Sequence, residues 1–288
     1  MSCQRSGAPD VRTAVVGHVE WIEFGHVERV PKAGDIVHAT DPWEEPGGGG
    51  AVSAVQLALL SGDCAFYTAL GDDERGAASK RRLEELGVRV EAVIRNEPTR
   101  RGVVFVDANG ERTITTLGRR LEPTTSDRLR WNELEGVDAV YFTAGNAGAL
   151  REARGARVLV ATSRISDLLV EADVHLDAVV GSGNDPSEAF DPSRLSHPPD
   201  LVVRTDSVRG GRYQTSKGRS GSYEPAEPPG PVVDTYGAGD SFAAGLTFAL
   251  GAGLGVEDAL ALAARCGAWC ASGKGPYGNQ LTASELQR

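Results

Sequence analysis

A glycine turn followed by an apolar run lies at residues 232–242, with the sequence Val-Val-Asp-Thr-Tyr-Gly-Ala-Gly-Asp-Ser-Phe. Gly237 and Gly239 leave backbone N–H groups accessible, and the apolar run 242–250 predicts a helix. Free N–H groups and the helix dipole favour a negatively charged ligand at such a start. Asp240 then lies at the mouth of an anion site. Its carboxylate either acts as a general base towards an attacking hydroxyl or caps the helix, and the local pattern leaves both open.

A second glycine turn opens another predicted helix. Gly47, Gly48, Gly49 and Gly50 lead directly into the apolar stretch 51–60. Glycine has no side chain and lets a ligand approach the backbone closely. The alternative is a flexible linker, but linkers rarely run straight into an apolar helix. We therefore favour a turn that faces a ligand.

Short continuous apolar runs predict strands that are buried on both faces of a parallel sheet. These runs are 13–17, 65–70, 139–142, 158–160, 178–180 and 201–203. Helical segments are expected near 51–60, 74–86, 126–134, 147–154, 164–172, 186–190, 239–250 and 256–272. Segments rich in β structure are expected at 25–45, at 88–117 with an Asn-Gly hairpin, and at 210–223. Ligands of such α/β domains bind beyond the carboxyl ends of the strands, so both glycine turns should face one cleft.

Composition and net charge argue against a nucleic-acid-binding protein. The chain has 288 residues, 40% hydrophobic and 24% charged, and a formal net charge of −10. A nucleic-acid-binding protein needs a basic face, so this balance argues against one. Small basic clusters at 80–82, 100–101 and 119–120 are interpreted as solvated surface.

The cysteines and the hydropathy pattern bear on location. Cysteines occur at positions 3, 64, 266 and 270, without the paired spacing of a zinc site. Cys266 and Cys270 lie four residues apart in a predicted helix and are interpreted as small core residues. No apolar run approaches the length of a membrane span or a signal peptide. We expect a cytoplasmic protein with reduced thiols.

Several segments, in the right order, resemble one known family. The segment 234–242 resembles the DTxGAGD signature of the PfkB, or ribokinase-like, carbohydrate kinases. Residues 47–51 are similar to the glycine signature near the N-terminus of that family, and 71–76 (Gly-Asp-Asp-Glu-Arg-Gly) resembles its GDDxxG segment. Pro98-Thr99 before a hairpin resembles the lid region. The resemblance covers about 11–280 and implies a ribokinase-like three-layer α/β/α fold, with a mostly parallel central sheet and a small β-rich lid.

The resemblance implies ATP-dependent transfer of the γ-phosphoryl group to a hydroxyl of a sugar or related molecule. Asp240 matches the catalytic base, and the N–H groups of Gly237, Ala238 and Gly239 match the anion hole. The nucleotide side would include four further residues, Thr205, Gly210, Asp234 and Thr235. Mg²⁺ would bridge the nucleotide phosphates. Glu188, in the segment Asp185-Pro186-Ser187-Glu188 that is similar to the NPxE segment of the family, would organise Mg²⁺ through water.

The acceptor side departs from the family pattern. The acceptor is expected to lie against Glu20, Gly48, Gly49, Gly50 and Asp240, with Glu23 also acidic and His18 near. The Asp that commonly binds sugar hydroxyls is replaced by Ile22, and the Asn often found in the glycine signature is replaced by Val52. On the nucleotide side, Ser207 stands where the family has a glycine. The acceptor itself is therefore not predicted.

Two alternatives to a sugar kinase remain open. The acceptor is a nucleoside or a sugar acid, which Arg100 and Arg101 at the lid would suit, although solvated lid charge is the preferred interpretation of both. Otherwise the protein binds nucleotide or sugar without catalysis, which the changes at Ile22 and Val52 motivate. We expect one kinase domain over 1–288 with lid excursions at about 25–45 and 88–117. The expected partners are ATP and a small sugar-like substrate, without nucleic acid or membrane, and a homodimer through the lid is possible.

Overall fold

The computed structural model describes residues 11–108 and 110–286, and a large sheet runs through its centre. In order across the sheet, its strands are β13 (Ser220–Tyr223), β12 (Gly211–Thr215), β11 (Leu201–Thr205), β10 (Ala178–Ser182), β9 (Val158–Thr162), β8 (Ala139–Phe142), β1 (Thr13–Val16), β4 (Cys64–Gly71) and β5 (Arg89–Arg95). The pairs from β11 to β5 are parallel, whereas β12 and β13 form an antiparallel ribbon at one edge. The apolar runs and the ribbon are thus confirmed as strands.

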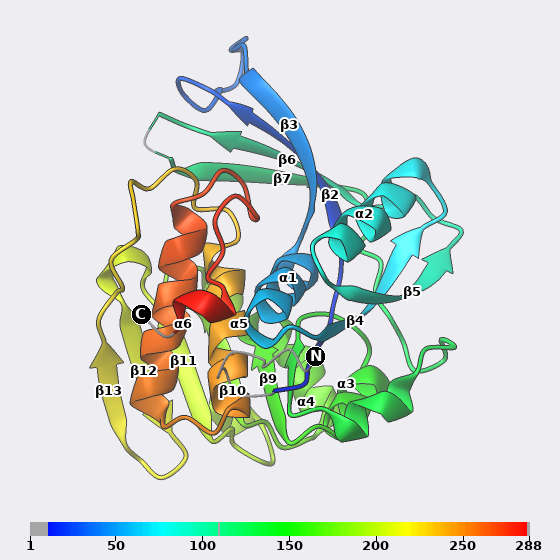
Figure 1. Cartoon of the computed structure of the whole chain (residues 1–288), viewed down its shortest axis with the longest axis vertical. Coiled ribbons are helices and arrows are strands. Elements are labelled where there is room, and N and C mark those ends of the chain that lie inside the picture. Colours follow the sequence, from blue (N-terminus) through cyan, green and yellow to red (C-terminus); the bar gives the residue numbers. More distant parts are fainter. Residues whose placement is uncertain (1–10, 109, 287–288) are drawn as a thin grey trace, which may run out of the picture.

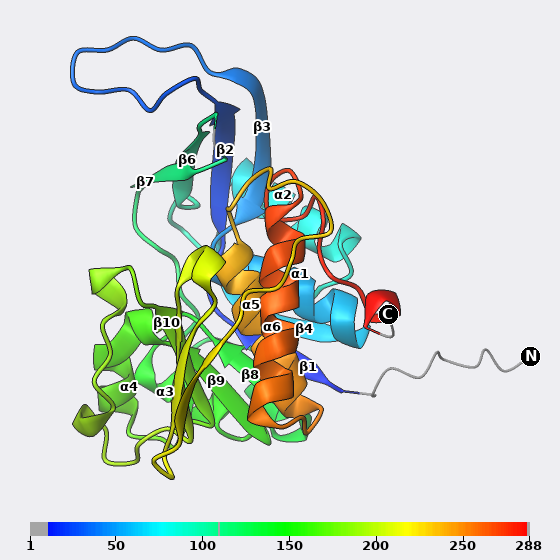
Figure 2. The same ribbon diagram turned by 90° about the vertical axis from the view of Figure 1, so that its left-hand side faces the viewer.

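Helices cover both faces of this sheet and make three layers (Figure 1 and Figure 2). One face carries α1 (Gly49–Ser61), α2 (Glu74–Glu85), α5 (Ala238–Gly251) and α6 (Val256–Ala271). The other carries α3 (Ala147–Ala153) and α4 (Ser166–Ala172). Short 3₁₀ turns are η1 (Trp131–Gly136), η2 (Ser163–Ile165), η3 (Pro186–Glu188), η4 (Pro192–Arg194), η5 (Ser207–Arg209) and η6 (Ala283–Glu285). No helix of the described residues is both long enough and apolar enough to cross a bilayer.

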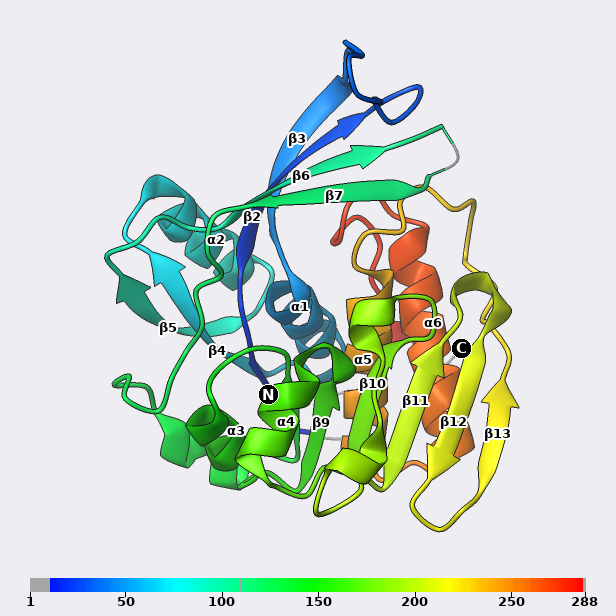
Figure 3. The ribbon, with the colours of Figure 1, turned by 180° about the vertical axis from the view of Figure 1, so that it is seen from behind.

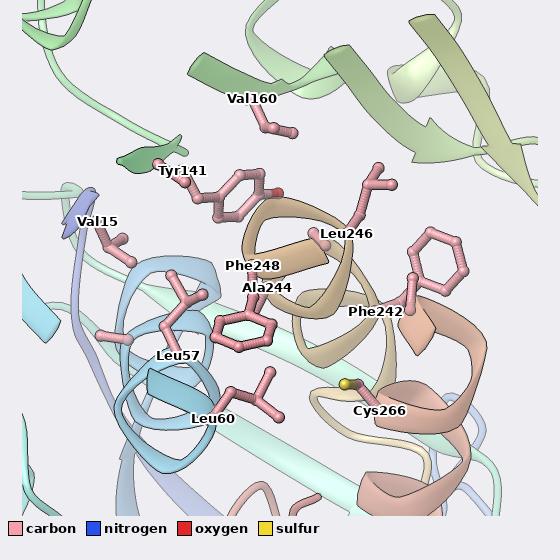
Figure 4. Packing of buried hydrophobic residues seen from close by; sticks show 14 of the residues in the cluster. Val15, Leu57, Leu60, Tyr141, Val160, Phe242, Ala244, Leu246, Phe248 and Cys266 are labelled. Atoms are coloured by element: carbon pink, nitrogen blue, oxygen red, sulfur yellow. The ribbon is translucent and has the colours of Figure 1, made fainter. Parts of the chain in front are cut away.

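The helix α5 is packed tightly from two sides. Its Phe248 lies against Leu57 and Leu60 of α1 in the core (Figure 4). On the other side α6 approaches so closely that a Cβ atom on Gly245 would lie 2.6 Å from Cys266 Sγ. Cys266 is fully buried, as predicted for a small core residue. Packing on both sides fixes the helix whose first turn carries the glycine motif.

A second, smaller sheet stands over the carboxyl ends of the parallel strands (Figure 1 and Figure 3). It contains, in spatial order, β3 (Thr40–Gly47), β2 (Glu20–His26), β6 (Arg101–Val106) and β7 (Arg112–Leu117). The strands β6 and β7 pair antiparallel, as the hairpin signal predicted, although Asn109 of that signal lies outside the described residues.

The expected extents of the small sheet, 25–45 and 88–117, are partly wrong. Strand β2 begins at Glu20, and β5 belongs to the large sheet, where it pairs in parallel with β4. The cause is the helix α2 between β4 and β5, since a strand–helix–strand unit returns the chain in parallel beside its first strand. Composition at 88–94 indicated a strand but carried no information on its partner.

The helix expected near 126–134 is also wrong, because only the short turn η1 forms there. The carboxylate of Asp127 accepts hydrogen bonds from the Thr124 N–H at 2.7 Å and from Arg95 at 2.6 Å. These side-chain bonds give the local backbone an alternative to a helix.

Candidate active site

The turn before α5 presents free N–H groups. Gly237 has a φ of 84°, a left-handed conformation that favours glycine, and it occupies the N-cap position of α5. In the described part of the chain, the N–H groups of Gly237 and Gly239 donate to no protein acceptor. The Ala238 N–H differs from the expectation, because it donates to the Thr235 carbonyl at 3.3 Å. The anion site therefore rests on the two glycine N–H groups and the positive end of α5.

A buried carboxylate shapes this turn from below. Asp234 is fully buried, and its two oxygens accept hydrogen bonds from the Tyr236 N–H at 2.8 Å and the Gly275 N–H at 3.1 Å. Burial raises its pKa. Thr235 beside it accepts a hydrogen bond from Arg112 at 3.1 Å. Of the four residues expected on the nucleotide side, two belong to this turn: Asp234 holds the backbone, and Thr235 lies beside the turn of the β6–β7 hairpin.

Asp240 lies where the two glycine turns meet. A Cβ atom on Gly49 would lie 3.0 Å from Asp240 Oδ1, so the structure brings the two glycine turns together at Asp240. No backbone N–H of the described residues donates to the Asp240 carboxylate, and Gly237 holds the N-cap position, so the alternative of a helix cap is wrong.

The environment of Asp240 suits a proton acceptor. The side chain keeps partial contact with solvent. Burial among protein atoms nevertheless raises its pKa to about 6, against a smaller opposing effect of the Arg112 guanidinium. A carboxylate with a pKa near the working pH accepts a proton more readily than an ordinary aspartate and is still ionised at neutral pH.

The first glycine turn lies beside the start of α5. Gly48 has a φ of 86°, and its N–H donates to the Tyr236 hydroxyl at 3.0 Å. A Cβ atom on Gly50 would lie only 2.7 Å from the backbone N and O of His18. Glycine is therefore required at both positions, by dihedral angle at Gly48 and by close packing at Gly50.

Charged and polar side chains gather beside this turn. Glu20 is buried, and its Oε1 lies 3.1 Å from Arg100 Nη1 and 3.9 Å from His18 Nε2. Burial raises the pKa of Glu20 and lowers that of His18 to about 3, so His18 is neutral. The Thr143 methyl lies 3.8 Å from the position of a Gly49 Cβ.

Three buried atoms of these residues have no hydrogen-bond partner in the described part of the chain, namely His18 Nδ1, Arg100 Nε and Thr143 Oγ1. Buried polar groups are normally paired, so such atoms indicate the place of a polar ligand. The interpretation of Arg100 as solvated lid charge is wrong, since only 21% of its side chain is exposed. Arg101 instead pairs with Glu23 at 2.7 Å and is more exposed.

The two altered acceptor positions are part of an apolar cluster. Ile22 and Val52 are fully buried and pack with Phe24, Val104 and Tyr236. Neither side chain offers an atom to a polar ligand. Their replacement of two polar family residues therefore joins α1 to the small sheet by apolar contact and leaves Glu20 as the acidic residue on that face of β2.

The nucleotide-side loop follows β11. Thr205 ends that strand, and Gly210 has a φ of 78° with the Tyr223 carbonyl 2.0 Å from where its Cβ would lie. Between them Ser207, which replaces a family glycine, has a φ of 49°. The serine adopts the left-handed conformation that glycine adopts more easily.

Glu188 lies at the end of the short turn η3. One carboxylate oxygen accepts the Ser182 N–H at 2.7 Å, and the other pairs with Arg164, which also contacts Asp185 at 2.8 Å. Each oxygen has a second lone pair that can accept a hydrogen bond from a metal-bound water. These oxygens therefore fit Mg²⁺ held through water, and the metal role of Glu188 stays a prediction.

Sequence reasoning missed four residues of this site. They are Arg112, Thr143, Arg164 and Tyr236. Arg112 follows the hairpin turn directly, and Tyr236 fills the variable position of the glycine motif, so both stood next to recognised signals. Thr143 and Arg164 come from loops after β8 and β9, and nothing in their local sequence indicated a site.

Comparisons with known proteins agree with this geometry. The model of the family described as "pfkB family carbohydrate kinase" matches residues 12–172 and 184–283. An ATP-dependent ribose-1-phosphate kinase from Halopiger xanaduensis is 28% identical over 279 residues, covering 92% of this chain and 93% of the relative. The ribokinase of Bacillus subtilis is 28% identical over 277 residues, covering 90% of this chain and 92% of its own.

Solved structures share the fold over nearly the whole chain. The Arabidopsis thaliana ribokinase complexed with ribose and ATP has a TM-score of 0.75 at 20% identity, covering 97% of this chain and 98% of that one. A microbiome-derived acarbose kinase has a TM-score of 0.81 at 22% identity, covering 97% and 99%. By sequence and by fold, this chain belongs to the pfkB family of carbohydrate kinases.

Proposed function

We propose that the protein is an ATP-dependent sugar kinase, which transfers the γ-phosphoryl group of ATP to a hydroxyl of a carbohydrate or a related small molecule. The observation that carries the proposal is Asp240 itself. Its carboxylate has a raised pKa, lies beside the free N–H groups of Gly237 and Gly239, and faces Gly49 across the cleft. A pure binding site gains nothing from a carboxylate next to phosphates, whereas phosphoryl transfer requires a base there.

In the proposed reaction, the acceptor hydroxyl lies between Gly49 and Asp240. Asp240 takes its proton while the hydroxyl oxygen forms a bond to the γ-phosphorus, and the bond to the leaving ADP oxygen breaks. The N–H groups of Gly237 and Gly239 stabilise the negative charge on the transferring group. Mg²⁺, when bound, neutralises charge on the phosphates of ATP, and Glu188 would hold it through water.

We propose that the chain works as one kinase domain in the cytoplasm, with the small sheet as a lid that excludes water during transfer. We also propose a homodimer through this lid. Supporting it, all six residues of β7 are exposed, and the outer edge of β7 is unpaired within the described chain.

Replacing the base tests the assignment most directly. We predict that Asp240→Asn lowers kcat about 10²–10⁴-fold, the usual contribution of a general base, because no group then accepts the hydroxyl proton. ATP binding, measured by calorimetry, should persist. Asp258→Asn on the exposed side of α6 is the matched control and should retain wild-type turnover. Full turnover by Asp240→Asn would contradict the role of Asp240.

The pH dependence gives a second, independent measurement. Only the ionised form of Asp240 accepts a proton, and its pKa is about 6. We predict that kcat/KM for the acceptor is constant above this pKa and falls about tenfold per pH unit below it. A profile that stays flat down to the ordinary aspartate range would show that Asp240 is not the titrating base.

The same pKa predicts an effect on stability. Burial raises the folded-state pKa of Asp240 from 3.8 to about 6, so its charge destabilises the folded protein above pH 6 and has no effect once both states are protonated. Allowing for partial exposure, Asp240→Asn should increase the free energy of unfolding by about 1–2 kcal/mol near neutral pH. The increase should disappear as the pH falls to 3.8. Denaturant unfolding at several pH values measures it, and destabilisation at neutral pH would contradict the assigned environment.

Arg100 favours a second candidate, an acceptor that carries a carboxylate or phosphate. Its guanidinium pairs with Glu20 beside the acceptor turn, and its Nε has no partner among the described residues. The charges of Arg120 and Arg164 also act on Glu20. The relative from Halopiger xanaduensis, named for a sugar phosphate, agrees with this candidate.

A substrate panel separates the two candidates. We predict that one class among neutral sugars, sugar acids, sugar phosphates and nucleosides exceeds the others about tenfold or more in kcat/KM, because one charge-assisted hydrogen bond is worth about 1.5–3 kcal/mol. Preference for neutral sugars supports the first candidate, and preference for sugar acids or phosphates supports the second. ATP binding without turnover of any acceptor would contradict both.

A further inference from the structure

One side chain connects three parts of the site. Tyr236 is buried, with 5% of its surface exposed. Its backbone is fixed on both sides, since its N–H donates to Asp234 Oδ1 at 2.8 Å and its carbonyl accepts from the Cys270 thiol at 3.4 Å. Its hydroxyl accepts the Gly48 N–H at 3.0 Å. The residue directly before the anion turn therefore holds the acceptor turn by a buried hydrogen bond.

The ring of Tyr236 extends this connection to the small sheet. It meets Phe24 of β2 edge to face, with ring centres 5.1 Å apart. Phe24 in turn stacks on Trp43 of β3 at 4.7 Å. The Lys274 ammonium lies 4.2 Å from the Trp43 ring centre and 2.6 Å from Asp41. Aromatic contacts thus run without a gap from the lid strands to the anion turn.

The fit around the hydroxyl leaves little room for another arrangement. A Cβ atom on Gly47 would lie 2.4 Å from the Tyr236 oxygen and 2.7 Å from Ile22 Cγ1. The backbone of the acceptor turn therefore reaches the hydroxyl only because Gly47 has no side chain. A displacement of Tyr236 changes the position of Gly48 and, next to it, of Gly49, which faces Asp240.

We propose that Tyr236 is a positioning residue that couples docking of the lid to the separation between the acceptor turn and Asp240. The hydroxyl fixes Gly48 relative to the anion turn, and the ring transmits the position of β2 to the same point. With the lid docked, the acceptor hydroxyl is held against Asp240 and water is excluded. This inference rests on the proposed kinase function.

The test separates positioning from ordinary core packing. Tyr236→Phe keeps the ring and removes the hydroxyl, leaving the Gly48 N–H without its partner. A lost hydrogen bond to a buried donor shifts an equilibrium about tenfold. We expect KM for the acceptor to rise about tenfold, while KM for ATP changes less than about twofold. The ratio of ATP hydrolysis without acceptor to phosphoryl transfer should rise about fivefold or more, because the loosened turn admits water.

Tyr277→Phe is the matched control. The Tyr277 side chain packs against the same apolar cluster, and its hydroxyl donates to the Pro46 carbonyl at 2.7 Å instead of accepting the Gly48 N–H. We expect a comparable loss of thermal stability but acceptor KM and hydrolysis ratio within about twofold of wild type. Phe24→Leu tests the ring contact without touching the hydroxyl, and we expect the hydrolysis ratio to rise while the KM for ATP stays constant.

The outcomes are distinct. If Tyr236→Phe retains the wild-type acceptor KM and hydrolysis ratio, or if Tyr277→Phe changes both as strongly, the coupling role is overturned. Equal loss of hydrolysis and transfer at unchanged KM also overturns it, since that indicates a structural role alone. If the wild-type protein transfers phosphoryl groups to no acceptor, the proposed kinase function itself fails, whatever the variants do.

Discussion

The hydrogen bonds of one buried carboxylate support most of the site. Asp234 has no contact with solvent, and it uses its two oxygens to hold the Tyr236 N–H and the Gly275 N–H. Burying a charge is costly unless it is compensated by such donors. These bonds fix the turn before α5 in a left-handed glycine conformation, and the N–H groups of Gly237 and Gly239 have no acceptor among the described residues. The same carboxylate anchors the loop that carries Lys274 beneath the small sheet.

Two arginines act on the carboxylate of Asp240 beside this turn. Asp240 is partly desolvated, which favours proton uptake, while Arg112 acts on it from the hairpin of the small sheet and Arg164 from the loop after β9. Arg112 reaches the site because its guanidinium donates to Thr235. The strength of the base therefore depends on where that hairpin lies.

The sequence was informative where the chemistry is local. The glycine turns at 47–50 and 237–239, with Asp240 beside the second, could be recognised because left-handed turns and helix starts depend on neighbouring residues. The partner of β5 could not be read from 88–94, since pairing depends on the crossover through α2. Arg100 looked like surface charge because only the fold brings it to Glu20. Tyr236 belongs to the recognised motif, but its hydrogen bond with Gly48 could not be predicted because the two residues are 188 positions apart in the sequence.

The place of Glu20 has a geometric consequence for the acceptor. Glu20 and Ile22 lie on the same face of β2, two residues apart, which corresponds to about 7 Å along a strand. Where the family commonly has an acidic side chain, this chain has an apolar floor, and its carboxylate is one strand repeat nearer the start of β2. The acidic group on this face of β2 is therefore displaced by two residues from the position that the family commonly uses. If Glu20 binds the acceptor as proposed, the polar edge of that molecule must reach this displaced position, so its shape as well as its charge would distinguish it from the acceptors of relatives with an aspartate at position 22.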